Sequence, residues 1–338
     1  MGKMTSRLAA AALVGGLAVL GAGCAANAAA PGSGHPSAAA AGSTALPNPF
    51  TILARYSAKS LGLDHPDALA IGPDGNLYVT DVSQRVTVIS PAGKVLRRWG
   101  KPGTGPGEFR FITFTDPTTP DVAGKIAVGS DGLVYVSDSG NARLQVFTRQ
   151  GRFVRQFGSF GSGKGQFLHP YDVAADNAGN VYVADDQGEN VSKFSPGGKV
   201  IWQIGGASGD PDLIGHHHFS AFDTHGRLVM VNDDVQKVLY VDAAGHKVDA
   251  FSPETASFTG GYVCEATVDA VGNAYVSGCG PGHTGATLVY DRAHRLIAKW
   301  PGTQYNLLRS PVFGPDSEVS ALATDGSILR LRITLPGR

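Results

Sequence analysis

Charged residues, cysteines and long apolar runs are all scarce in this chain of 338 residues. Charged residues make up only 17 % of it, and 28 Lys and Arg balance 28 Asp and Glu. A disordered chain would carry more charge and fewer hydrophobic residues than the 42 % found here. The balance of charges also removes the electrostatic case for binding nucleic acid, which requires a basic surface.

Glycine, in contrast, is abundant. The chain has 46 glycines, about twice the ~7 % share of an average protein. They interrupt short apolar runs and do not follow a helical period, so a protein of long helices is excluded. The composition predicts an all-β fold of short strands joined by tight turns.

Residues 1–24 have the layout of a secretory signal peptide. Lys3 and Arg7 precede an apolar run of 13 residues, Leu8–Leu20, which small residues and Cys24 follow. The run is shorter than the ~20 residues that a membrane-spanning helix needs. Its end resembles a bacterial lipobox, which implies lipid modification of Cys24, although Gly21 stands where that motif usually has leucine. The alternative is ordinary cleavage after Ala28, which follows an A-x-A pattern.

Residues 25–49 consist almost entirely of Ala, Gly, Ser and Pro. Such a segment buries too little apolar surface to offset its ordering entropy, so we predict a disordered tether. Without Lys3 and Arg7 the chain keeps 26 basic and 28 acidic residues, a net charge of −2. We therefore expect an extracytoplasmic protein, either a membrane lipoprotein or secreted, that binds no nucleic acid.

A repeat fills residues 50–338. Its clearest part is a glycine turn followed by an apolar strand, and the turn residues are 57, 47, 47, 46 and 45 positions apart. Two further patterns recur, a strand before a Pro/Gly turn and a strand ending in an aromatic residue or Ile. About 45 residues and four strands per unit is typical of a β-propeller blade. The turn residues are Gly75, Gly132, Gly179, Gly226, Gly272 and Ser317.

The ends of the repeat region predict how the ring closes. The sixth repeat has three strands, around Pro311–Phe313, Val319–Leu322 and Ile328–Ile333, and lacks a fourth. The segment Ile52–Ser57 matches that missing strand. We therefore predict a six-bladed β-propeller of four-stranded antiparallel blades, whose last blade is closed by the N-terminal strand. The extra residues between Phe111 and Asp121, which lengthen the first interval, are expected to form a Pro/Thr-rich loop.

These motifs resemble the NHL-repeat family of β-propellers. GNLYVTD at residues 75–81 and AGNVYVAD at 178–185 are close to its signature, as are the linkers GPGEF at 105–109 and GKGQF at 163–167. Repeats one to three match well, four and five in part, and six poorly. The resemblance implies the fold but little about function, because the family includes binding platforms, RNA-binding modules, sensor domains and a metal-dependent lyase.

Cys264 and Cys279 lie on either side of a turn at Val271-Gly272. A two-residue turn there would place the two cysteines directly opposite one another on neighbouring strands, within reach of a disulfide. An exported protein occupies a compartment where disulfides persist. We predict a structural Cys264–Cys279 bridge; the alternative is two small buried thiols.

Three histidines, His65, His169 and His216, occupy one equivalent position at the start of the innermost strand in repeats one, three and four. Convergent imidazoles are a plausible Zn²⁺ site. The resemblance to the amidating lyase, which cleaves hydroxyglycine-ended peptides and uses channel histidines, points the same way. In that enzyme, however, the histidine tends to follow the proline, whereas here it precedes Pro66 and Pro170. The simpler interpretation is a structural role.

Other patterns have structural interpretations. In the family, aspartates such as Asp81, Asp138 and Asp185 accept turn hydrogen bonds, and a calcium site is the alternative. Within the run His216–His218, strand geometry lets at most two side chains share a ligand. The glycine-rich runs 100–107 and 158–165 lack the strand-to-helix context and the Gly-Lys-Ser/Thr ending of a phosphate loop. We expect them to be inter-blade connectors.

The sequence contains no recognisable catalytic set. We therefore predict a monomeric, extracytoplasmic binding, scaffold or sensor module for a protein, a peptide or a cell-wall glycan, held at the membrane by a lipid anchor and needing no cofactor. The alternative is a metal-dependent lyase or hydrolase that uses the channel face, with Zn²⁺ or Ca²⁺ and with His65, His169 and His216 as ligands.

Overall fold

Six antiparallel sheets of four strands each fill the chain from Phe50 to Ile333. The computed structural model describes residues 46–116, 119–122, 124–206, 209–255, 262–279, 286–300, 309–314, 318–323 and 325–335. No helix in these ranges is long and apolar enough to cross a membrane. Residues 1–45, which hold the predicted signal peptide, Cys24 and most of the predicted tether, lie outside the described residues.

Each sheet is one blade, and its strands follow one another in the sequence from the innermost to the outermost, except in blade 6. The blades are as follows: blade 1, β2 (Pro66–Ile71), β3 (Leu77–Asp81), β4 (Arg85–Ile89) and β5 (Val95–Trp99); blade 2, β8 (Ile126–Val128), β9 (Leu133–Asp138), β10 (Arg143–Thr148) and β11 (Phe153–Phe157); blade 3, β12 (Pro170–Ala175), β13 (Val181–Asp185), β14 (Asn190–Phe194) and β15 (Val200–Gly205); blade 4, β16 (His217–Phe222), β17 (Leu228–Asn232), β18 (Lys237–Val241) and β19 (Lys247–Phe251); blade 5, β20 (Tyr262–Val268), β21 (Ala274–Cys279), β22 (Thr287–Tyr290) and β23 (Leu296–Trp300); blade 6, β24 (Arg309–Phe313), β25 (Glu318–Leu322), β26 (Ile328–Ile333) and β1 (Phe50–Tyr56).

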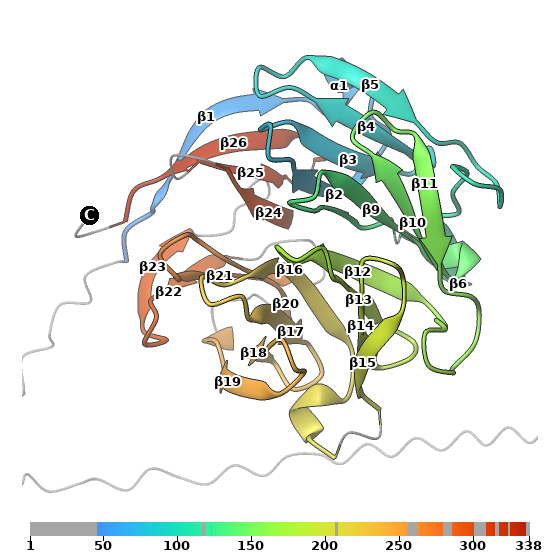
Figure 1. Ribbon diagram of the computed structural model, residues 1–338. Coiled ribbons are helices and arrows are strands. Elements are labelled where there is room, and N and C mark those ends of the chain that lie inside the picture. The colour runs from blue at the N-terminus through green and yellow to red at the C-terminus, as the bar shows by residue number, and fades with distance from the viewer. Residues whose placement is uncertain are drawn as a thin grey trace, which may run out of the picture. The chain divides into compact units, whose positions relative to one another are not determined.

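The inner strands close a ring. β2 contacts β8, β8 contacts β12, and the contacts continue through β16, β20 and β24 back to β2. In Figure 1 the inner strands labelled there, β2, β12, β16, β20 and β24, lie towards the middle of the molecule. The chain is thus a six-bladed β-propeller, as the repeat spacing predicted.

The last blade is closed by the first strand of the fold. β1 pairs with β26 in antiparallel register from Phe50–Ile333 to Tyr56–Ile328. The Phe50 ring stacks on Trp300 of blade 5 with centroids 4.6 Å apart. Just before β1, the Pro49 carbonyl accepts a hydrogen bond from the Thr334 amide at 2.8 Å. The predicted closure by an N-terminal strand is confirmed.

The core lies between neighbouring blades, where the second strands bury their largest side chains. Tyr78, Tyr135, Tyr182 and Tyr275 occupy the same position in blades 1, 2, 3 and 5, and all are buried. Three of these hydroxyls bond to an aspartate of the preceding turn, as in Tyr135 Oη to Asp131 at 2.8 Å. The hydrogen bond satisfies the polar end of a ring whose body fills the gap between two sheets.

The glycine-rich runs are connectors between blades, as expected. Gly100 and Gly158 begin the two connectors with φ of 99° and 93°, a region that favours glycine. A Cβ at Gly158 would lie 2.4 Å from the ring of Phe167, which the same connector buries in the next inter-blade core. Only glycine allows the chain to turn this close to the aromatic residue that ends the connector.

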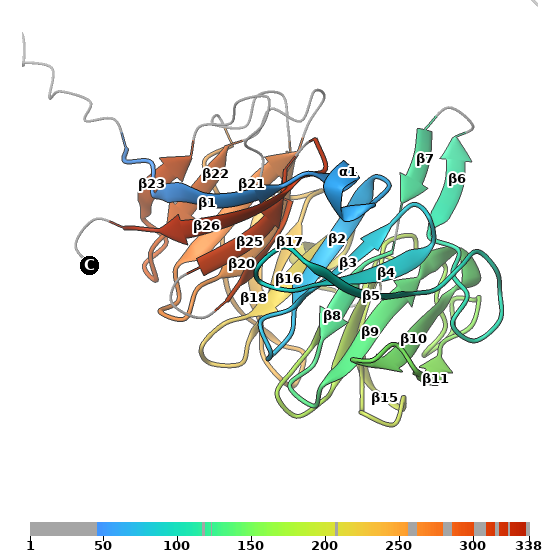
Figure 2. The same cartoon turned by 90° about the horizontal axis from the view of Figure 1, so that it is seen from above.

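The segment expected to be a Pro/Thr-rich loop instead contains a two-stranded hairpin, β6 (Ile112–Asp116) and β7 (Thr119–Val122). Figure 2 shows this hairpin standing away from the blade strands. Threonine favours extended backbone even where proline interrupts pairing, which accounts for the difference. A short helix, α1 (Ala58–Leu61), joins β1 to blade 1; the Ser57 side chain caps its start and Gly62 ends it in the left-handed region.

Candidate functional site

The starts of the inner strands lie on one face of the propeller, together with the connectors and the turns after the second strands. Of the three predicted ligands, His169 and His216 come together at one carboxylate. Asp186 Oδ2 lies 3.6 Å from His169 Nδ1, and Asp186 Oδ1 lies 3.5 Å from His216 Nε2. His169 and Asp186 belong to blade 3 and His216 to blade 4, so the contact bridges the seam between these blades.

His65 does not join them. Its side chain is 87 % exposed, and Nδ1 lies 2.7 Å from Asp64 Oδ1. It borders a separate pocket between blades 6 and 1, whose other walls include Lys59 and Asp325. The structure therefore assembles two of the three predicted histidines.

Four aspartates that the sequence analysis missed complete the group at the seam. We call the set His169, Asp172, Asp186, His216, His218, Asp233 and Asp234 the seam cluster. Asp186, Asp233 and Asp234 directly follow the second strands of blades 3 and 4, and Asp172 lies on β12. Aspartates at strand ends are common, so only their spatial proximity marks them as a site.

His218 contacts carboxylates of both blades at the seam. Its Nδ1 lies 3.2 Å from Asp172 Oδ2 of blade 3, and its Nε2 lies 3.7 Å from Asp233 Oδ2 of blade 4. Burial opposes protonation, but the two carboxylates outweigh it and raise the pKa of His218 to about 10. At neutral pH this imidazolium donates a hydrogen bond to Asp172 and forms an ion pair with Asp233, so it is neither a general base nor a metal ligand.

His216 is more accessible, with 46 % of its side chain exposed. Its Nδ1 lies 3.1 Å from Asp234 Oδ2, on the opposite side of the ring from Asp186. Desolvation lowers the pKa of His216, but Asp234 and Asp186 more than compensate and leave it raised. Among the described residues, the ligand atoms of His216, Asp233 and Asp234 all lie within 4.8 Å of one another, and these three could hold a metal ion.

His217 is buried and points away from its two neighbours, as strand alternation requires. Neither of its ring nitrogens lies within hydrogen-bond distance and angle of a partner in the part of the chain that the structure describes. Desolvation lowers the pKa of His217 to about 4, so it is a neutral core residue. The expectation that at most two members of the His216–His218 run can face one ligand agrees with this arrangement.

The aspartates that end the second strands hold turns and connectors. Asp185 accepts backbone hydrogen bonds from Leu168 and His169, and Asp81 accepts one from the Ser83 amide at 3.0 Å. Asp138 is the most elaborate case, because it faces the guanidinium of Arg143 at 2.7 Å. These contacts fit the structural role, and the calcium role remains an untested alternative.

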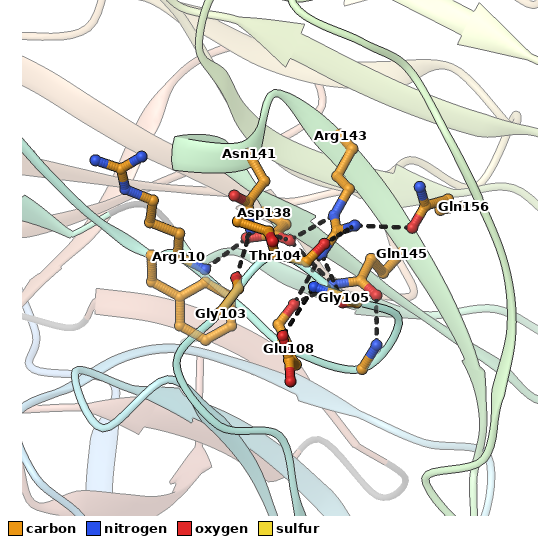
Figure 3. A network of polar contacts seen from close by, with 12 residues as sticks. Gly103, Thr104, Gly105, Glu108, Arg110, Asp138, Asn141, Arg143, Gln145 and Gln156 are labelled. Atoms are coloured by element: carbon orange, nitrogen blue, oxygen red, sulfur yellow. Dashed lines mark hydrogen bonds and ion pairs between the residues drawn. The ribbon is translucent and has the colours of Figure 1, made fainter.

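Figure 3 shows how Arg143 and Asp138 fix the connector from blade 1. The Arg143 guanidinium also donates to the carbonyls of Thr104, Gly105 and Glu108, at 2.8 to 2.9 Å. One buried cation thereby satisfies three connector carbonyls that no strand could pair. The connector holds the face in shape without contributing a reactive group.

The predicted pairing of the two cysteines needs a correction in register. β20 pairs Tyr262 with Cys279, and Cys264 lies at a bulge between Val263 and Glu265. The cysteines are therefore not directly opposite one another, because a bulge adds a residue to one strand and shifts its partners. The side chain of Cys279 lies outside the described part of the chain, so the disulfide stays a prediction.

Comparison with known proteins supports the fold and its repeats. A family model described as a 6-bladed beta-propeller (DUF5128) matches residues 123–203. Mouse peptidyl-glycine alpha-amidating monooxygenase is 37 % identical over 120 residues, which cover 32 % of this chain and 11 % of that protein. The Drosophila melanogaster protein brain tumor is 37 % identical over 70 residues, 20 % of this chain and 6 % of that protein. The matches thus span only a small part of the length of these relatives.

Solved structures resemble nearly the whole propeller. A streptogramin B lyase has a TM-score of 0.57 at 11 % identity and covers 85 % of this chain and 98 % of its own. A gluconolactonase from Xanthomonas campestris has a TM-score of 0.57 at 13 % identity, covering 85 % and 97 %. At such identities the likeness shows the fold alone. With the six closed blades, these findings identify the chain as a six-bladed β-propeller whose repeats are similar to those of NHL-repeat proteins.

Proposed function

We propose that this chain is an extracytoplasmic binding or sensor module, and that the face carrying the seam cluster receives a protein, a peptide or a cell-wall glycan. A propeller presents loops from all its blades on one face, which suits recognition of an extended ligand. The signal-like start of the sequence supports export. We propose that the propeller acts as a monomer and without nucleic acid.

The charge of the seam cluster is the observation that carries this proposal. It has four carboxylates, Asp172, Asp186, Asp233 and Asp234, against three imidazoles, of which His218 is the one held most firmly protonated. The acidic groups outnumber the basic ones even when every imidazole is charged. Such a surface favours a ligand that brings a basic group, because complementary charge steers and orients the partner.

The experiment measures binding of the full-length mature protein to two probes: a fluorescent Gly/Ser peptide with three lysines, and purified peptidoglycan in a pelleting assay. We expect one of them to bind, and the double variant Asp233→Asn, Asp234→Asn to bind at least fivefold more weakly. Asp249→Asn is the matched control, because Asp249 is a half-exposed carboxylate of blade 4 on the outer strand β19. Failure of both probes, or equal binding by all three proteins, would overturn the proposal.

A metal-dependent lyase or hydrolase is the second candidate, and the convergence of His216, Asp233 and Asp234 favours it. One imidazole and two carboxylates are a donor set that Zn²⁺ accepts with an open position. Bound there, zinc would act as a Lewis acid and lower the pKa of a bound water. His216 would first have to lose its proton, so binding should weaken below its raised pKa.

Metal analysis separates the two candidates. The untagged protein is equilibrated with Zn²⁺ or Ca²⁺, desalted and analysed by mass spectrometry. One bound ion per chain, lost in His216→Ala and reduced in His169→Ala, would support the enzyme. If His65→Ala also lost it, the three-histidine site of the sequence analysis would be favoured. A protein that retains no ion would support the binding module.

The lipid anchor is tested independently of the ligand. If Cys24 is lipidated, Cys24→Ser should move the protein from the membrane fraction to the medium when it is expressed in a bacterial host with its leader. Mass spectrometry of the wild-type N-terminus should then find a diacylglycerol on Cys24. Cleavage after Ala28 in the wild-type protein would instead establish secretion.

A further inference from the structure

A cavity runs along the centre of the ring. Its walls are the inner strands of the blades, with Ala68–Ile71, Lys125–Val128, Asp172–Ala175 and Pro311–Phe313 among them. Its volume is about 250 Å³, just below the roughly 300–1,000 Å³ of pockets that bind drug-sized molecules. An occupant must therefore be a small molecule, and a folded partner or a bulky glycan is excluded.

Two side chains of opposite charge line this cavity, Lys125 from blade 2 and Asp172 from blade 3. Only 10 % of the Lys125 side chain and 12 % of the Asp172 side chain are exposed. Burying a charge is costly unless it has a partner, so two buried charged groups in one cavity require partners that hold them there. By strand register, Lys125 of blade 2 and Asp172 of blade 3 occupy equivalent positions, where blade 1 has Ala68.

Each of the two charged groups contacts residues of neighbouring blades. Lys125 Nζ lies 3.4 Å from Asp67 Oδ1 of blade 1 and 4.9 Å from the ring centre of Tyr171. Asp172 Oδ2 lies 3.2 Å from His218 Nδ1 of blade 4. Four blades thus fix an ammonium and a carboxylate at one end of the cavity, which is the preorganisation that recognition of a small charged ligand needs.

In the lining as a whole, polar and apolar atoms contribute about equally, and aliphatic residues supply part of the apolar share. Leu69, Ile126, Val173 and Val312 line the cavity beyond the charged end. A pocket with a few converging polar groups and apolar walls is the usual form of a small-molecule site. The two charged groups set the orientation of a ligand and the aliphatic walls set its size.

The geometry points to a binding site for a small aliphatic α-amino acid in the central channel. The ligand carboxylate contacts the Lys125 ammonium, its ammonium contacts the Asp172 carboxylate, and its side chain lies along the aliphatic wall. The site lies beneath the face assigned to a larger ligand and goes beyond that proposed function. Such a site suits a sensor in which an amino acid bound in the channel alters binding of the larger ligand at the face.

Isothermal titration calorimetry of the full-length mature protein tests the site with four ligands. L-Leucine and L-alanine carry both charges; 4-methylpentanoate lacks the ammonium and isoamylamine lacks the carboxylate. We expect L-leucine to bind at least tenfold more tightly than either single-charge analogue. Because this comparison uses only the wild-type protein, it does not depend on whether a variant folds.

Variants then locate the binding. Lys125→Met and Asp172→Asn should each weaken L-leucine binding at least tenfold, whereas Lys101→Met, at an exposed lysine outside the cavity lining, should not. Ala175→Leu narrows the cavity, so it should weaken L-leucine more than L-alanine. No binding of either amino acid, or equal binding of L-leucine and its analogues, would overturn the inference. Neither result bears on the lysine peptide or on peptidoglycan, so the two proposals fail separately.

Discussion

Arg143 holds together parts of the chain that are far apart in sequence. Its guanidinium faces the buried carboxylate of Asp138 on the neighbouring strand and three carbonyls of the connector from blade 1 (Figure 3). Only 8 % of the Arg143 side chain and none of the Asp138 side chain is exposed. Water cannot replace a lost partner in such a place, so the pair matters more than a surface ion pair.

Arg143→Met should therefore lower the free energy of unfolding by about 3–5 kcal/mol, because it leaves the Asp138 charge buried and unpaired. Arg149→Met in the same blade is the control, since the Arg149–Asp74 pair is a half-exposed contact at 3.5 Å and should contribute less than about 1 kcal/mol. Denaturant unfolding measures both values. Equal losses would mean that burial does not set the strength of the Arg143 network.

The histidines of β16 should make stability depend on pH in two opposite ways. His218 has a raised folded pKa of about 10, so its contribution is complete below the unfolded pKa of 6.5 and is lost as pH rises through 10. His217 has a lowered folded pKa of about 4, so it costs stability as pH falls from 6.5 towards 4.

Unfolding free energies at pH 4.5, 6.5 and 9 should show both effects. His218→Gln should remove much of the loss between pH 6.5 and 9. His217→Gln should remove an acid loss that reaches about 3 kcal/mol when complete, at about 1.4 kcal/mol per unit of pKa. If the difference between wild type and each variant does not change with pH, the titrations are assigned to the wrong residues.

At the scale of the strand, most of the inner strands contain a β-bulge, which their alternation of hydrophobic residues does not reveal. β2, β12, β20 and β24 each have an irregularity near their start in the pairing with the second strand, and β16 has one between Phe219 and Ala221. A bulge leaves the alternation of the remaining strand intact while moving the residues before it by one partner. This displacement moves Cys264 out of direct opposition to Cys279.

The disulfide stays a prediction after this correction: diagonal neighbours on a regular strand pair lie about 7–8 Å apart, so the bulge at Cys264 would have to bring the two side chains closer. Peptide mapping without reduction should find Cys264 linked to Cys279. The double variant Cys264→Ser, Cys279→Ser should lose about 3 kcal/mol of unfolding free energy, as expected for a short closed loop. Alkylation of both cysteines in the denatured, unreduced protein would refute the bridge.

At the scale of the whole molecule, the ring depends on a contact between its two ends. β1 covers the edge of β26, and Phe50 packs on Trp300 and on Tyr275, whose ring centre is 6.0 Å away. A propeller without this strand would expose an unpaired edge and open the apolar seam between blades 5 and 6.

Removal of residues 1–57 should therefore abolish the single cooperative unfolding transition and cause aggregation, seen by calorimetry and size-exclusion chromatography. Phe50→Ala, which keeps the strand, should cost about 3–5 kcal/mol. Removal of residues 1–44 alone is the control and should leave the melting temperature unchanged. If the longer truncation melts as the control does, ring closure by β1 contributes nothing to stability.

Much of the fold could be predicted because each blade repeats local information. A glycine turn, an alternating strand and an aromatic ending recur at regular spacing, and the missing strand of the last repeat could be matched to the first. The β6–β7 hairpin and α1 escaped prediction because each occurs once, so no second copy reveals its pattern. Asp186, Asp233 and Asp234 were missed for a related reason, since an aspartate after a strand has no distinctive spacing.

The sequence by itself determined the six blades, their order and the closure of the ring, because turns and alternation are local and the repeat fixes their number. Only the tertiary structure decided which histidines meet, which carboxylates surround them, and that Lys125 and Asp172 line one cavity. Those contacts join side chains from different blades, and their distances depend on bulges and on how neighbouring sheets pack.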